Sequence, residues 1–124
     1  MGDIFRRIDV CGITAEGDIL GCASGERAPW AVIDPGATKT VFSSKLANAV
    51  QAPWISGINA RVEGRAVPLH LASVQLRAPA CEIDALAVAV DDVLVGRAGL
   101  GPGGVQADVV LGHDYLQNKQ ATVS

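Results

Sequence analysis

The chain has 124 residues, of which 49 % are hydrophobic and 19 % charged, and its formal net charge is −3. This length predicts a single domain over residues 1–124 with enough apolar side chains for one hydrophobic core. The small acidic excess argues against nucleic-acid binding, because that function needs Lys and Arg side chains to neutralise phosphates. No uncharged apolar run reaches the ~18 residues of a membrane-spanning helix, and the polar start at Met1 does not resemble a signal peptide. We therefore expect a cytoplasmic protein without a membrane segment.

The cysteine and histidine content predicts no metal or cofactor. Cys11, Cys22 and Cys81 are odd in number and lack Cys-x-x-Cys spacing, which argues against a disulfide framework and against a zinc site. We expect all three to be reduced and mostly buried. The chain contains only two histidines, His70 and His113, so a metal site or a Cys–His nucleophile has few partners to draw on.

The first half of the chain predicts short strands and one helix. Apolar and polar residues alternate over 4–11, a short strand follows at 19–23, and the apolar run 28–33 is typical of a strand buried on both faces. Ser43 and Ser44 precede residues 45–50 and predict a short N-capped helix there.

The second half begins with a predicted hairpin over residues 54–76, which turns at Glu63-Gly64 and carries Pro68 at an edge position. The remaining elements are then a strand at 82–90, a Gly-rich loop at 99–104, a strand at 108–111, a helical turn at 113–118 and a strand fragment at 121–123. Many short strands with two small helices predict an all-β fold, either a closed small barrel or a sandwich.

Asp34 is the strongest candidate for a catalytic residue. It ends the apolar run, and Gly36 and Ala37 after it leave the backbone room for a close approach. Asp-Pro-Gly is also strong turn chemistry, so a turn-capping aspartate is an equally direct interpretation. The residues alone leave both open.

A second segment extends the pattern around Asp34. Val41-Phe42-Ser43-Ser44-Lys45-Leu46 follows it as a strand running into a helix, and Val110-Leu111-Gly112 leads into the small helix His113-Asp114-Tyr115-Leu116. In this order the motifs resemble the retropepsin-like aspartic proteases, a single-lobed, viral-type family with many bacterial members. The resemblance extends from about Ile19 to Val123. It implies an acid-protease fold, a small closed barrel whose flap is the hairpin around Gly64.

The resemblance also implies an aspartic endopeptidase that works as a homodimer. Each subunit contributes Asp34, and the two carboxylates share one proton and activate a water against a peptide bond. Gly36, Ala37 and Gly64 contact an extended peptide or protein substrate, and no cofactor or metal is required.

Pro35 departs from the family pattern, in which Thr or Ser follows the aspartate and its hydroxyl bonds the opposite subunit. Proline offers neither a hydroxyl nor an N–H. The alternative function is therefore a catalytically inactive or weakened domain that serves dimerisation or peptide binding.

Other polar residues have simpler interpretations. Asp91-Asp92 predicts a solvated strand end, and His113 with Asp114 predicts a cap or a subunit contact. Asp114 also lies where bacterial members of the resembled family often carry an Asp, and this resemblance implies a structural polar contact. His70 is expected at the surface or at the flap base. Trp30 and Trp54 are expected in the core or lining a groove, and the Gly-rich stretch 99–104 lacks the Lys-Ser/Thr of a phosphate loop.

Overall fold

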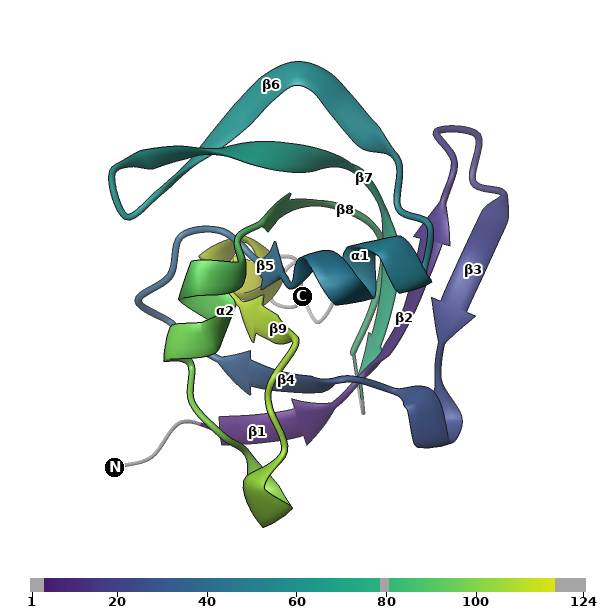
Figure 1. Cartoon of the computed structure of the whole chain (residues 1–124). Helices are drawn as coiled ribbons and strands as arrows, with labels where there is room; N and C mark the ends of the chain where they lie inside the picture. Colours follow the sequence, from purple (N-terminus) through teal and green to yellow (C-terminus); the bar gives the residue numbers. More distant parts are fainter. Residues whose placement is uncertain (1–3, 79–80, 118–124) are drawn as a thin grey trace.

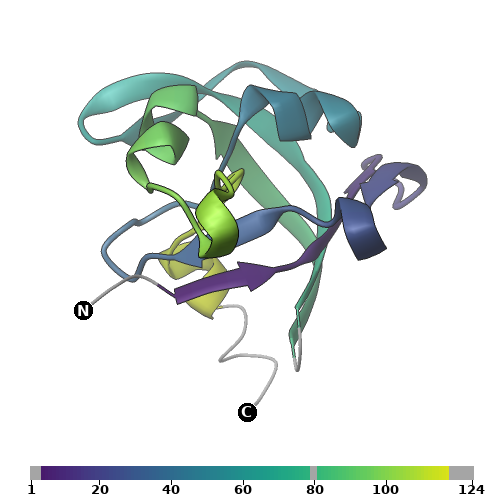
Figure 2. The ribbon, with the colours of Figure 1, turned by 60° about the horizontal axis from the view of Figure 1, so that its bottom comes forward.

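The structure is a computed structural model that describes residues 4–78 and 81–117, with side chains at 5–70, 85–101 and 103–117 (Figure 1). The strands are β1 Ile4–Arg7, β2 Asp9–Ile13, β3 Ile19–Ala23, β4 Trp30–Ile33, β5 Val41–Phe42, β6 Trp54–Val62, β7 Arg65–Ala78, β8 Cys81–Val90 and β9 Val109–Leu111. The helices are α1 Ser44–Ala49 and α2 Asp92–Arg97, with 3-10 turns η1 Gly25–Arg27 and η2 Pro102–Gly104. Residues 113–117 are also helical. In the views of Figures 1 and 2, both α1 and α2 lie nearer to the β6–β7 hairpin than β1 does.

The strands form one mixed sheet in the order β1-β4-β9-β5-β8-β7-β2-β3, with β6 attached to β7. Strand β4 runs parallel to β9, and β5 runs parallel to β8. Within the described residues, the end strands β1 and β3 do not pair with each other, so the sheet is open. The expected all-β acid-protease fold with a closed small barrel is therefore wrong, and the architecture is mixed α/β with short helices. Alternating residues predict individual strands, but they do not specify which strands become neighbours.

Strand β9 lies between β4 and β5, which follow one another in the chain. It pairs in parallel with β4, where Ile33 faces Leu111, and antiparallel with β5, where Phe42 faces Val109. All three strands are almost fully apolar because neighbours cover both of their faces. The parallel pairing brings the ends of β4 and β9 together, which places Asp34 beside the segment that follows Leu111.

Helix α1 begins as predicted. Ser43 is its N-cap, and the Ser43 side-chain oxygen accepts a hydrogen bond from the Leu46 N–H at 3.1 Å. This contact satisfies one of the backbone donors that a helix start leaves unpaired. The predicted helix over 45–50 is confirmed to within one residue at each end.

Helix α2 corrects the prediction for Asp91-Asp92. Asp91 is 6 % exposed and caps α2, its carboxylate accepting the N–H groups of Val93 and Leu94 at 3.0 and 3.2 Å. A solvated strand end is therefore wrong for Asp91. Asp92 is exposed, and it accepts the backbone N–H and the hydroxyl of Ser44 at 2.8 and 2.7 Å. An aspartate directly before an apolar run is also an N-cap signal, and Asp91 acts as one here.

The predicted hairpin is confirmed. Strands β6 and β7 pair up to the contact of Val62 with Arg65, and the chain turns through Glu63 and Gly64. Both turn residues have positive φ, 49° and 77°, which matches the right-handed twist of the two strands. Pro68 faces Asn59 of β6, while the pairing of β7 with β8 begins only at Leu69.

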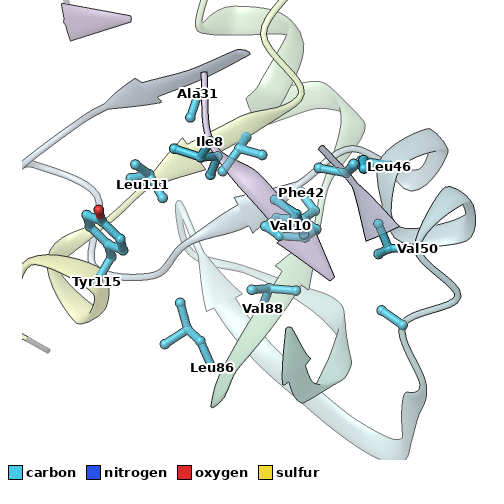
Figure 3. Packing of buried hydrophobic residues seen from close by; sticks show 13 residues of the cluster. Ile8, Val10, Ala31, Phe42, Leu46, Val50, Leu86, Val88, Leu111 and Tyr115 are labelled. Atoms are coloured by element: carbon cyan, nitrogen blue, oxygen red, sulfur yellow. The ribbon is translucent and has the colours of Figure 1, made fainter. Parts of the chain in front are cut away.

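The core has two packed clusters of apolar side chains. The larger cluster gathers residues from β2, β5, β8, β9 and α1 around Phe42, whose side chain is fully buried (Figure 3). The smaller cluster includes Val32, Val62, Val67 and Val110, and so connects β4 and β9 with the hairpin. Burying a side chain of this size contributes about 1.5–3 kcal/mol. The hairpin is therefore held against the sheet by apolar contacts of Val62 and Val67.

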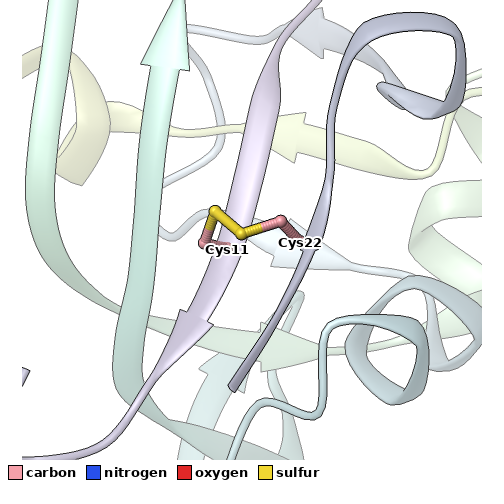
Figure 4. Close-up of a disulfide and its surroundings, with 2 residues drawn as sticks. All are labelled: Cys11 and Cys22. Carbon is pink, nitrogen blue, oxygen red and sulfur yellow. A yellow bond between two sulfur atoms is a disulfide. The ribbon is translucent and has the colours of Figure 1, made fainter. Parts of the chain in front are cut away.

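The structure corrects the prediction of reduced cysteines for Cys11 and Cys22, whereas the side chain of Cys81 lies outside the described residues. Cys11 on β2 and Cys22 on β3 are register partners and form a disulfide (Figure 4). Cys11 is half-buried and Cys22 exposed, so neither is the buried thiol that was expected. Cysteine count and spacing do not show strand register, which is what brings these two residues together.

Candidate active site

Asp34 stands directly after β4 with its backbone held on both sides. Its N–H donates to the Leu111 carbonyl at 3.0 Å, which continues the β4–β9 pairing by one residue. Its carbonyl accepts the Ala37 N–H at 3.0 Å and closes a tight turn over Pro35 and Gly36. Proline suits the second position of such a turn because its φ is already fixed there.

The Asp34 carboxylate takes part in the same turn. Oδ1 accepts the Gly36 N–H at 3.0 Å, while Oδ2 accepts no hydrogen bond from the residues that the structure describes. A Cβ at Gly36 would lie 3.3 Å from Oδ1, so a glycine allows this close approach. The turn-capping interpretation of Asp34 is therefore confirmed. One carboxylate oxygen is left exposed to solvent, so the turn and a chemical role are compatible.

The loop after Asp34 is fastened to the segment after β9. His113 N–H donates to the Ala37 carbonyl at 2.7 Å. The buried Thr40 donates its N–H and its hydroxyl to Asp114 Oδ1 at 2.9 and 2.7 Å, and the Thr40 hydroxyl accepts the Gly112 N–H at 3.1 Å. These bonds make Asp114 a structural polar contact, as predicted. They also fix the position of the loop that carries Asp34.

Gly112 is required by this packing. A Cβ there would lie 2.6 Å from the backbone carbon and oxygen of Lys39, a distance that real side chains do not reach. The Val110-Leu111-Gly112 motif therefore has a steric basis, since the loop around Lys39 crosses the chain where β9 ends.

A cavity of about 370 Å³ opens beside Asp34, between its loop and the hairpin tip. Five of its lining residues belong to the loop and three to β6 and its turn. The lining residues are Asp34, Gly36, Ala37, Thr38 and Lys39 from the loop, Arg61, Val62 and Glu63 from the hairpin, and Leu94 from α2. A second cavity of about 110 Å³ also reaches Asp34, from the side of α2 and β9. The carboxylate of Asp34 is therefore accessible from a hollow that the hairpin covers, and Figure 1 shows the loop after β4 and the hairpin tip on one side of the molecule.

Two ion pairs attach the hairpin tip to α2. Arg97 Nη1 lies 2.6 and 2.9 Å from the two carboxylate oxygens of Glu63. The side chain of Arg65 forms an ion pair with Asp91, the buried N-cap of α2. Asp91 is buried, whereas Glu63 and Arg97 are both exposed. Solvent and salt therefore screen the Arg65–Asp91 pair less than the Arg97–Glu63 pair.

Within the described residues, Asp34 is the carboxylate lining the larger cavity that forms no ion pair. The other, Glu63, has both oxygens bound by Arg97. One chain therefore presents one available carboxylate at this cavity, together with the cations Lys39 and Arg61.

The structure brings together three of the four residues predicted for the site. Asp34, Gly36 and Ala37 line the cavity, whereas Gly64 sits in the hairpin turn and does not line it. Lys39 and Glu63 were not singled out from the sequence as site residues. No local motif marks them, because they reach the cavity only through the crossing of the hairpin over the loop.

His70 is a buried titratable residue at the base of the hairpin. It lies opposite Trp54 on β6 and Val88 on β8, and its side chain is 1 % exposed. Neither ring nitrogen has a hydrogen-bond partner among the described residues, and the ring meets the half-exposed indole of Trp54 edge-on at 70°. Burial lowers the pKa of His70 from 6.5 to about 4. His70 therefore lies buried at the base of the β6–β7 hairpin, and a surface position is wrong.

The part of the chain that the structure describes shows no group of three or more His, Cys, Asp or Glu side chains placed to hold a metal ion. None of its helices is long and apolar enough to cross a membrane. No protein-family model matches the chain, and none of the curated proteins is significantly similar to it.

Proposed function

We propose that the chain is one half of a homodimeric aspartic endopeptidase, a hydrolase in which Asp34 of each subunit forms the catalytic pair. The observation that carries the proposal is the accessible Asp34 carboxylate at a cavity beneath a hairpin. Further support comes from the local motifs around Asp34 and Gly112, which resemble those of retropepsin-like proteases. The fold class lends no support.

A second copy is needed because one chain offers one available acid. Glu63 is engaged by Arg97, and we therefore assign the partner of Asp34 to another subunit. Two carboxylates at hydrogen-bonding distance share a single proton, because both cannot easily be ionised. The pair then contains a base and an acid side by side.

The reaction follows from that pair. The ionised carboxylate takes a proton from a water whose oxygen attacks the peptide carbonyl carbon, while the protonated carboxyl donates its proton to the carbonyl oxygen. The tetrahedral intermediate collapses as the C–N bond breaks. The leaving amine nitrogen receives a proton from the Asp34 pair. A hydroxyl group of the intermediate gives its proton back to that pair as the new carbonyl forms. No cofactor takes part in this scheme.

The hairpin provides a binding edge for the substrate. Among the described residues β6 pairs only with β7, so its other edge has backbone groups available to an extended peptide. Adding a strand to such an edge is a common way to hold a peptide. Arg61, Val62 and Glu63 then lie against the substrate, with Gly36 and Ala37 on the opposite side of the cavity.

The first experiment compares the purified chain with Asp34→Asn on an unfolded protein substrate from acidic to neutral pH. Asparagine can still accept the Gly36 N–H, so the turn is retained while the acid is lost. Cleavage by the parent chain that disappears in Asp34→Asn supports the proposal, and undiminished cleavage refutes it. Asp18→Asn, an exposed carboxylate in the β2–β3 turn, is the matched control and should retain full activity.

Mixing the two chains tests the dimer. If each active site needs two Asp34 residues, an equal mixture of parent and Asp34→Asn chains halves the activity per parent chain, because half of the parent chains then have an inactive partner. A monomeric enzyme would show no such loss.

The second candidate is a catalytically inactive or weakened domain for dimerisation or peptide binding. It is favoured by Pro35, which lacks the family hydroxyl, and by the use of Asp34 Oδ1 within its own turn. Pro35→Thr distinguishes the two candidates. A gain of cleavage would identify Pro35 as the residue that weakens catalysis, whereas a stable dimer without cleavage before and after the change would favour the binding domain.

The cytoplasmic location expected from the sequence also stays a proposal. The Cys11–Cys22 disulfide weighs against it, because disulfides persist mainly in oxidising compartments.

A further inference from the structure

The cavity beside Asp34 contains four charged side chains, two acidic and two basic. They are Asp34, Lys39, Arg61 and Glu63. Their net charge is balanced, so the ligand that the cavity prefers depends on which charges already have partners within the chain.

Two of the four charges are compensated. Lys39 Nζ lies 3.7 Å from Asp114 Oδ2, and Glu63 is bound by Arg97 of α2 through both carboxylate oxygens. An ion pair that is already made reduces the attraction of either partner for a ligand. The charges left for a ligand are therefore those of Asp34 and Arg61.

Arg61 is held in place but not neutralised. Its Nη1 donates to the Gly64 carbonyl across the hairpin turn at 3.0 Å. Within the described residues no carboxylate forms an ion pair with its guanidinium, Asp34 included. The remaining donors of the exposed guanidinium are available. A ligand group can lie in the cavity between Arg61 and Asp34 without displacing an existing ion pair.

The element that carries Arg61 is well anchored. Val62, the next residue, is 6 % exposed and packs in the smaller core cluster, and the turn beyond it is tied to α2 by the Glu63 and Arg65 ion pairs. A side chain on a fixed strand loses less entropy on binding than one on a free loop. The position of Arg61 is therefore suited to recognising one substrate group.

We infer that Arg61 is a specificity-determining residue that selects peptides with an Asp or Glu side chain next to the scissile bond. The inference rests on the proposed function, because it places the acidic residue beside the bond that the Asp34 pair would hydrolyse. The planar guanidinium binds a carboxylate through parallel hydrogen bonds, which a Lys or a neutral donor does not reproduce. The shared proton leaves the Asp34 pair with a single negative charge, so repulsion of the substrate acid is limited.

Cleavage of matched peptides provides the first test. Two peptides with amidated C-termini differ only by Glu or Gln beside the scissile bond, and a third carries Gln with a free C-terminal carboxylate. The parent chain should cleave the Glu peptide with a kcat/KM about tenfold above the Gln peptide, since a charged hydrogen bond of this kind is worth at least that factor. In Arg61→Gln the ratio should fall close to one, while the matched control Arg27→Gln in η1 should keep it. A ratio unchanged in Arg61→Gln overturns the inference. Preference for the third peptide over the amidated Gln peptide would assign the site to a terminal carboxylate instead of a side chain.

Binding separates this inference from the proposed function. Fluorescence anisotropy of the labelled Glu and Gln peptides on Asp34→Asn does not require catalysis. One outcome is that the parent chain cleaves no peptide, while Asp34→Asn binds the Glu peptide more tightly than the Gln peptide and Asp34→Asn/Arg61→Gln does not. The enzyme proposal then fails and the recognition by Arg61 stands. If peptides are cleaved but the two bind equally, the inference on Arg61 is wrong and the enzyme proposal stands.

Discussion

The burial of His70 makes a quantitative prediction about folding. The unfolded chain protonates His70 near pH 6.5, whereas the folded chain does so only near the lowered pKa of about 4. Between these values the unfolded state binds a proton that the folded state does not, so the free energy of unfolding decreases as the pH falls. The loss begins below pH 6.5 and is nearly complete at pH 4, where it amounts to about 3 kcal/mol.

The perturbation is His70→Phe, which keeps an aromatic ring opposite Trp54 and Val88 but removes the titrating nitrogens. Urea unfolding followed by circular dichroism at pH 4, 5, 6 and 7 gives the free energy of unfolding of each variant at one fixed protein concentration. The difference between pH 7 and pH 4 should be smaller in His70→Phe than in the parent chain by about 3 kcal/mol. Other titrating groups are the same in both chains and cancel in this comparison.

The second histidine is the matched control. His113 is exposed, and the effect of His70→Phe should stay at about 3 kcal/mol when both chains also carry His113→Gln. Parallel stability curves for the parent and His70→Phe would refute the reasoning, because they would show that the His70 ring is protonated equally well in the folded and unfolded chains.

Three further changes test the packing around the site and the sheet edge. In thermal unfolding, Gly112→Ala should lower the free energy of unfolding by about 2 kcal/mol or more, since its Cβ meets the backbone of the Asp34 loop. The control is Gly96→Ala on α2, where a Cβ meets nothing. It should raise the free energy of unfolding by about 0.5–1 kcal/mol in the same assay. Asp114→Ala leaves the buried Thr40 without its acceptor and should lower the free energy of unfolding by about 2–3 kcal/mol in urea unfolding. A loss below about 0.5 kcal/mol would contradict the two hydrogen bonds from Thr40 to Asp114. Replacing Cys11 and Cys22 together by Ser opens a loop with a sequence separation of 11 and should lower stability by about 3 kcal/mol in non-reducing buffer, with no difference between the two proteins once a reductant has opened the bridge.

Local chemistry accounts for the elements that were predicted well. The Glu63-Gly64 turn, the Ser43 cap of α1 and the turn after Asp34 each depend on a few adjacent residues. Their backbone preferences and short-range hydrogen bonds are the same in any fold, which is why a sequence alone can predict them.

Long-range contacts account for the predictions that were wrong. The open mixed sheet depends on β9 inserting between β4 and β5, and no periodicity in the chain specifies that insertion. The Cys11–Cys22 disulfide depends on the register of β2 with β3, and the burial of His70 depends on the pairing of β7 with β6 and β8. Each of these requires residues that are distant along the chain, or register choices that a one-residue slip would reverse.

The length and composition of the chain, its turns and the position of Asp34 at the end of an apolar strand were determined by the sequence alone. The tertiary structure decided what surrounds that carboxylate. It brought Arg61 to the cavity from β6, bound Glu63 to Arg97 and joined the Asp34 loop to Asp114, because only the crossing of the hairpin and of β9 brings these charges within reach. Electrostatic environment depends on distance through space, and a linear sequence does not contain those distances.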